Sequence, residues 1–168
     1  MLENHILSSV EIEMSDDKVV KQNLETETPE SMDLNELVNH ELLVLVNALL
    51  HCSYQFVLLR SVSESLALQS SSWMTEKKDD KCRDSAVKIL SWIQENNGYL
   101  ELADITKPKF NESTLDVVII FARWDEVEKW IEEKVERIKG KIQETDYEKN
   151  TEVILMLERS LSHILSYE

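Results

Sequence analysis

Helix-breaking residues are rare in this sequence, and their rarity constrains the fold more than any other feature. The 168 residues include only two glycines and two prolines, and one of each, Gly98 and Pro108, lies within residues 96–108. Glycine readily takes the left-handed conformation that ends a helix, and proline cannot continue one. Residues 96–108 are therefore predicted to form an extended connection between two long helical regions of an all-α chain.

Apolar spacing predicts four helices. The first is expected to begin near Asp33, where Glu36 completes a capping box. Its apolar stripe alternates spacings of three and four residues (Leu34, Val38, Leu45, Ala48, Cys52 and Leu59). A second helical region covers about residues 63–97, and its polar middle, residues 75–84, leaves open whether it is one helix or two.

Two further helices are expected after the connection. The third carries one apolar face (Leu115, Val118, Phe121 or Ala122, Trp124, Ile131, Val135, Ile138 and Ile142). A break near Thr145 and Asp146 leads to a last helix over about residues 151–167, with Val153, Leu157 and Leu161 on its apolar side.

Charge and cysteine content limit the classes of partner and the cellular compartment that the sequence favours. A formal net charge of −15 argues against nucleic acid and anionic membranes as partners, because both need a basic face. The most apolar run, residues 42–59, is interrupted by polar residues and is predicted to be a buried helix. Cys52 and Cys82 are too few for a disulfide framework, so a reducing, cytoplasmic compartment is expected. Residues 1–30 are predicted to be a disordered acidic arm, and residues 31–168 one helical domain.

The connection also resembles a known family. An apolar helix end, then Gly-x-Leu-x-Leu-x-Asp-Ile-x-Lys-Pro over residues 98–108, then another long helix is similar to the connection between the second and third helices of ferritin subunits. Gln22-Asn23 and Asn39-x-Glu41-Leu42 extend the resemblance. It implies a ferritin-like four-helix bundle with a long crossover between helices 2 and 3, and it favours a single second helix. The family's fifth helix has no counterpart here, so the resemblance does not imply a cage built from this chain alone.

The resemblance implies a mostly erased iron-oxidation site. Such a site needs inward carboxylates and a Glu-x-x-His pair, and no histidine here has a glutamate three residues before it. Cys82 and Ser85 occupy the positions of that glutamate and histidine. Glu41 keeps the first-helix ligand position, and Asp125 is the nearest candidate acid on the third helix. Because Glu41 lies on the apolar stripe, it requires a basic partner or a metal, and both alternatives stay open.

Iron storage also needs acids that nucleate mineral. Glu76, Asp80 and Asp84 are spaced by four residues, and the resemblance places them on the cavity face of the second helix, although a solvated face explains the spacing equally well. The sequence is therefore interpreted as a cytoplasmic ferritin-family subunit that binds iron and stores it as ferric mineral, with little ferroxidase activity. Its partners would be iron ions and other ferritin subunits or copies of itself. The alternative is an interaction or scaffold bundle, derived from ferritin, that no longer binds iron.

Overall fold

The computed structural model describes residues 33–96, 98–105 and 117–167, and this part of the chain is all-helical, with no strand. It contains α3 (Leu34–Ser65), α4 (Gln69–Glu95), α5 (Val117–Gln143) and α6 (Asn150–Leu165). The prediction of an all-α chain with four helices over these residues is confirmed. The expected acidic arm over residues 1–30 and the apolar position Leu115 lie outside the described residues.

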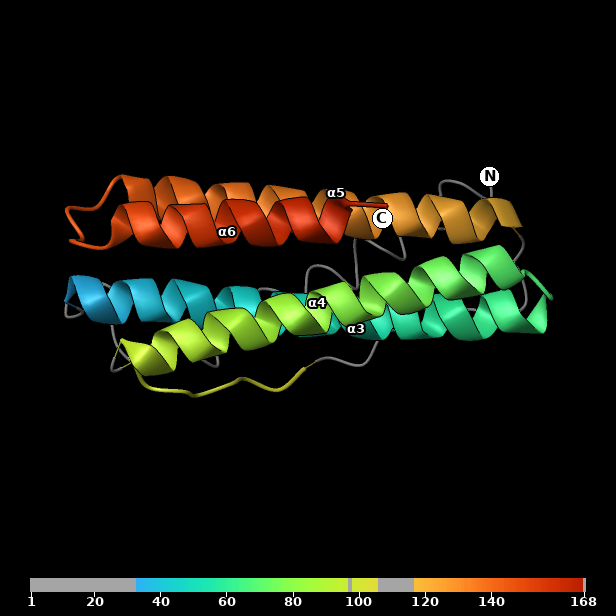
Figure 1. Cartoon of the computed structure of the whole chain (residues 1–168), viewed down its shortest axis with the longest axis horizontal. Coiled ribbons are helices and arrows are strands. Elements are labelled where there is room, and N and C mark those ends of the chain that lie inside the picture. Colours follow the sequence, from blue (N-terminus) through green and yellow to red (C-terminus); the bar gives the residue numbers. More distant parts are fainter. Residues whose placement is uncertain (1–32, 97, 106–116, 168) are drawn as a thin grey trace.

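The helices form two stacked hairpins (Figure 1). The α5–α6 hairpin lies on the α3–α4 hairpin, so that α3 contacts α4 and α5, while α6 contacts α5 and α4. In this view α4 ends at the left, whereas α5 begins at the right. Residues 98–105 are extended and run back from the end of α4 along the bundle. The end of α4 and the start of α5 therefore lie at opposite ends of the bundle.

Helix α3 is the central element of the bundle. The side chain of Asp33 accepts a hydrogen bond from the Glu36 backbone N–H at 2.8 Å, so the predicted N-terminal cap is confirmed. Residues 41–49 are all buried, on every side of the helix, whereas Leu34 in the first turn is 42% exposed. Within the described chain, α3 alone is long and apolar enough to span a membrane by length and composition, and 78% of that window is buried inside the bundle.

The boundary between the first two helices differs from the prediction. Residues 63–65 continue α3, and α4 begins only at Gln69. The Ser63 hydroxyl donates to the Leu59 carbonyl and lies 2.8 Å from the Ser71 hydroxyl, which ties the two helix ends together. Ala67, with φ of 57°, makes the turn in the left-handed region. Helix α4 is continuous through its polar middle, so the alternative of two helices is excluded.

Gly98 ends α4 in a way that the sequence did not indicate. No described glycine has a positive φ, so the predicted left-handed conformation of Gly98 is wrong. Its N–H donates to the Ile93 carbonyl at 2.7 Å. A Cβ at this position would lie 2.4 Å from Ile93 Cγ2 and 2.7 Å from Asn39 Nδ2. Glycine is needed here because the chain passes so close to α3.

The apolar faces of α5 and α6 are largely as predicted. The residues expected from Trp124 to Ile142 are buried, as are Val153, Leu157, Leu161 and Ile164 on α6. Val118 is a correction, because it is 67% exposed, and Phe121 is 50% exposed. For the alternative between Phe121 and Ala122, the structure favours Ala122, which is half-buried. Val118 and Phe121 lie on the part of α5 that extends past the end of α6, since Glu128 already contacts Tyr167 just beyond α6. Ile119 and Ile120 are buried in that turn instead.

Candidate functional site

Glu41 is buried and engaged in an ion pair. Its side chain is 10% exposed, and its Oε1 atom lies 3.2 Å from Lys141 Nζ. Lys141 lies in the last turn of α5, one hundred residues further along the chain. Of the two alternatives that the sequence left open for Glu41, the structure contains the basic partner.

Cys82 and Ser85 do not lie beside Glu41. Cys82 is near Cys52 of α3, since a charge on Cys82 contributes to the raised pKa of the Cys52 thiol after burial, which is the larger cause. Burial also raises the pKa of Cys82 to about 12. Because Cys52 follows Glu41 by eleven residues, the two are about 16 Å apart along α3. Both thiols are free and fully buried, and Ser85 Oγ is buried without a hydrogen-bond partner.

Asp125 is separated from Glu41 as well. It is exposed on α5, where its charge contributes to the raised pKa of Tyr167 after the larger effects of Glu128 and burial. Lys141, the partner of Glu41, is sixteen residues further along the same helix, which corresponds to about 24 Å. The structure therefore does not bring these two candidate ligands together, because they belong to different levels of the bundle.

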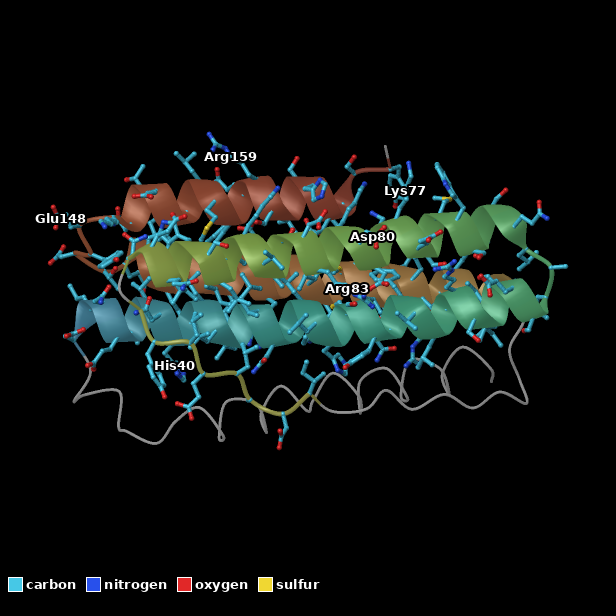
Figure 2. The ribbon with its side chains drawn as sticks, turned by 60° about the horizontal axis from the view of Figure 1, so that its bottom comes forward. His40, Lys77, Asp80, Arg83, Glu148 and Arg159 are labelled. Atoms are coloured by element: carbon cyan, nitrogen blue, oxygen red, sulfur yellow. The ribbon has the colours of Figure 1, made fainter. Side chains whose placement is uncertain are left out.

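The three acids proposed as a nucleation face lie on α4 and differ in their exposure and in their ion pairing. Glu76 is half-buried and forms an ion pair with Arg60 of α3 at 3.3 Å. Asp80 and Asp84 are exposed, and Figure 2 shows Asp80 on the surface of α4. Asp84 is close enough to His163 of α6 for its charge to oppose the lowering of the His163 pKa by burial and nearby lysines. Only Asp80 and Asp84 remain exposed for an added cation.

A buried charge network centred on Lys78 was not foreseen. Lys78 Nζ lies 2.8 Å from Glu128 Oε1 of α5 and also donates to the carbonyl oxygens of Ile164 and Ser166. Glu128 in turn accepts from the Trp124 indole N–H at 2.7 Å and from the Tyr167 hydroxyl at 3.2 Å. The network joins α4 to α5 and caps the C-terminal end of α6. In the sequence Lys78 belongs to a polar run, and periodicity gives no sign of its burial.

A second unforeseen feature, here called the polar seam, lies between α3 and α5. It consists of Asn47, His51 and Gln55 on α3, spaced by four residues, with Arg123 and Lys134 on α5. Arg123 donates to Gln55 Oε1 through Nε and Nη2, at 3.3 and 2.9 Å, and Gln55 Nε2 lies 3.3 Å from His51 Nε2. Burial lowers the pKa of Arg123 to about 10, so its guanidinium stays charged at neutral pH.

The donor set of the interior is poorly suited to Fe²⁺. Among the residues that the structure describes, no group of three or more His, Cys, Asp or Glu side chains could hold a metal ion. The buried acids are Glu41, paired with Lys141, and Asp79, paired with Arg83 at 2.9 Å. Figure 2 shows Arg83 between α4 and α3, where its Nε also donates to Ser53. Buried cations outnumber these acids (Lys78, Lys81, Arg123 and Lys134).

Comparison with known proteins gave no match to any family or to any curated protein sequence.

Proposed function

We propose that this chain is a ferritin-like subunit that contributes to cytoplasmic iron storage through assembly and mineral binding, without an efficient oxidation centre of its own. The path of the chain is the observation that carries the proposal. The antiparallel pair α3 and α4 is followed by residues 98–105, which run back along the bundle, and then by the second pair α5 and α6, an order compatible with a ferritin-like bundle. The sequence of residues 98–108 supports the same assignment.

Assembly is supported by apolar side chains that the described chain leaves exposed. Tyr54 and Val57 on α3 are 47% and 38% exposed. Tyr99, Leu100 and Leu102 on the extended segment are also exposed, and Figure 2 shows this segment in front of α3. Aromatic and aliphatic groups of this kind are typical of protein interfaces. These five residues are here called the α3 surface. We propose that the α3 surface contacts another ferritin-like subunit or a copy of the chain.

Iron would be bound at the surface under this proposal. The buried acids Glu41 and Asp79 are already paired with cations, whereas Asp80 and Asp84 present carboxylates one helical turn apart. Iron oxidised elsewhere in a mixed assembly could be held there as ferric mineral. The chain would act as the mineral-binding partner of an oxidising subunit.

A second candidate function is an interaction or scaffold bundle that does not bind iron. The ion pair between Glu41 and Lys141 favours it, because the one acid that the resemblance retains as a ligand is already neutralised by a cation. In this case the α3 surface would be the functional surface, and Asp80 and Asp84 would only be solvated.

The two candidates differ in their response to iron. Fe²⁺ is added anaerobically to the purified protein, air is admitted, and size-exclusion light scattering measures particle size and soluble ferric iron. Iron storage predicts a soluble ferric core that is reduced in the D80N/D84N variant. The control variant, D104N/D146N, removes two exposed aspartates that lie off α4 and is expected to retain the core. Protein that keeps no ferric iron in solution, alone or mixed with an oxidising ferritin subunit, would refute the storage role and leave the scaffold function.

The assembly surface is tested separately. Substitution of Tyr54 and Tyr99 by aspartate is expected to convert oligomers into monomers, because two charges would be buried at the contact. Val87→Asp on α4 is the matched control, since Val87 is 60% exposed and lies outside the α3 surface. An unchanged oligomeric state in the Tyr54 and Tyr99 variant would exclude this surface as the contact.

A further inference from the structure

The face of α4 that contacts α6 continues past the end of α6. The Trp92 indole N–H donates to Glu152 near the start of α6, and Lys81 Nζ donates to the Ser166 carbonyl just beyond its end. These two α4 residues are eleven positions apart, which is three helical turns, so they mark one face of the helix. Met74, seven positions before Lys81, lies on the same face and is partly buried against the core. In the described chain α6 ends before it reaches the level of Met74 (Figure 1).

The corresponding face of α5 shows the same arrangement. Lys139 pairs with Glu158 of α6 at 3.3 Å, and Glu128, eleven positions earlier on α5, accepts from the Tyr167 hydroxyl at 3.2 Å. Phe121, seven positions before Glu128, continues this face. Phe121 is 50% exposed, and Tyr167 is 65% exposed. Both α4 and α5 therefore present apolar side chains along a stretch where Figure 1 shows that α6 has already ended.

The stretch beyond α6 is here called the three-helix end and is defined by Met74, Phe121 and Tyr167. Its length fits a helix of about three turns. Helix α4 extends nine residues from Lys78, which donates to a carbonyl at the end of α6, to its own start, which is about 14 Å. Helix α5 extends eleven residues from Glu128 to its start, which is about 17 Å. A helix that packs there needs this length and one apolar stripe.

Residues 2–14 of the acidic arm have the length and the apolar pattern of such a helix. Five apolar side chains fall within an arc of about 140° when the segment is drawn as a helix (Leu2, Ile6, Leu7, Val10 and Met14). Thirteen residues form a helix about 18 Å long. A segment this short is not a stable helix alone, but packing of its apolar face supplies the missing stability.

The arm is long enough to reach the three-helix end from the start of α3. Arg60 of α3 pairs with Glu76 of α4, so the level of Met74 lies about 40 Å along α3 from Asp33. Residues 15–32 can span up to about 59 Å when extended. Attachment to the same chain gives the arm an effective concentration on the order of millimolar. We propose that residues 2–14 dock intramolecularly on the three-helix end as an amphipathic fourth helix.

Amide hydrogen exchange in the full-length chain gives the first test. The variant I6D/V10D places two carboxylates on the apolar stripe of the arm, and the matched control N4D/S8D adds the same charge to the opposite side. Docking predicts that I6D/V10D accelerates exchange of residues 117–124 at least about tenfold, because burial of a single aliphatic side chain already stabilises by about that factor. Exchange around Glu41, at the other end of the bundle, should not change in either variant. Equal exchange of residues 117–124 in I6D/V10D and N4D/S8D would refute the proposal.

A distance measurement identifies the segment that covers the three-helix end. A nitroxide is attached at S8C, since the two native cysteines are fully buried, and the indole N–H signals of the tryptophans are recorded by NMR. Docking predicts selective broadening of Trp124, one turn from Phe121, relative to Trp92, which lies about 27 Å along α4 from Met74. The selectivity should be lost when I6D/V10D is added to the labelled chain. Equal Trp124 and Trp92 signals would overturn the proposal. Broadening only between different molecules in an isotope mixture would overturn it too, because the docked arm would then belong to a second copy.

Discussion

Replacing Lys78 by methionine removes the centre of the buried charge network while keeping a side chain of similar length. The Lys78 and Glu128 side chains are 3% and 12% exposed, so solvent screens their pair weakly. Removing one partner of such a pair costs about 3–5 kcal/mol, because the other charge stays buried. Glu128 retains its bonds from Trp124 and Tyr167, which favours the lower half of that range. In a chain of this size the loss corresponds to a fall in Tm of roughly 6–16 °C.

Thermal and urea unfolding followed by circular dichroism would measure this loss. Lys139→Met is the matched control, because Lys139 pairs with Glu158 at 3.3 Å, and that carboxylate is 49% exposed. Loss of the Lys139–Glu158 pair should lower the free energy of unfolding by no more than about 1 kcal/mol. The double variant K78M/E128Q should be less destabilised than the sum of its single variants, since it leaves no uncompensated charge. A Lys78→Met cost equal to that of the control, or strict additivity in the double variant, would refute the reasoning.

Three further predictions concern the backbone and the buried thiols. Gly98→Ala should destabilise the fold because of the close contacts described above. Gly140→Ala places its new Cβ with no atom within 4 Å, so it should raise the free energy of unfolding by about 0.5–1 kcal/mol. The urea midpoints of the two variants measure this difference. Ala67→Gly should raise the urea midpoint, since the left-handed conformation costs alanine roughly 1 kcal/mol or more, and an unchanged or lower midpoint would contradict this. Cys52 and Cys82 should resist alkylation at pH 8 until the protein unfolds. Because burial raises their pKa in the folded state, stability should fall above about pH 9, where the thiols of the unfolded chain ionise first, and C52A/C82A should reduce that fall.

The helices could be predicted because their causes are local. The Asp33 cap and the apolar positions of α6 depend on residues within one or two turns, and each is found where the sequence placed it. Gly98 was correctly identified as a helix end, but its reason is contact with Asn39 on another helix. Local propensity cannot distinguish a glycine needed for its backbone angle from one needed for space.

The candidate site was less predictable because its partners are distant in sequence. Glu41 was recognised as a buried acid that needs a partner, yet Lys141 could not be chosen among the lysines of α5 without the packing of α5 on α3. Lys78 lies in a run of polar residues that resembles a solvated face, although it is 2% exposed. Burial of such lysines depends on which helix covers them, and this is a tertiary property.

Because α6 is short, the two ends of the bundle should differ in their resistance to local unfolding. Where α6 is present, four helices pack together, and Lys78 and Lys81 donate hydrogen bonds to the carbonyl oxygens at its C-terminal end. Beyond that level the described part of the chain continues as three helices, α3, α4 and the start of α5, and Val118 and Phe121 are exposed there. Amide protons there should exchange with solvent sooner than those around Glu41, because fewer contacts must break for local opening. The bundle should therefore come apart from the end where α3 turns into α4.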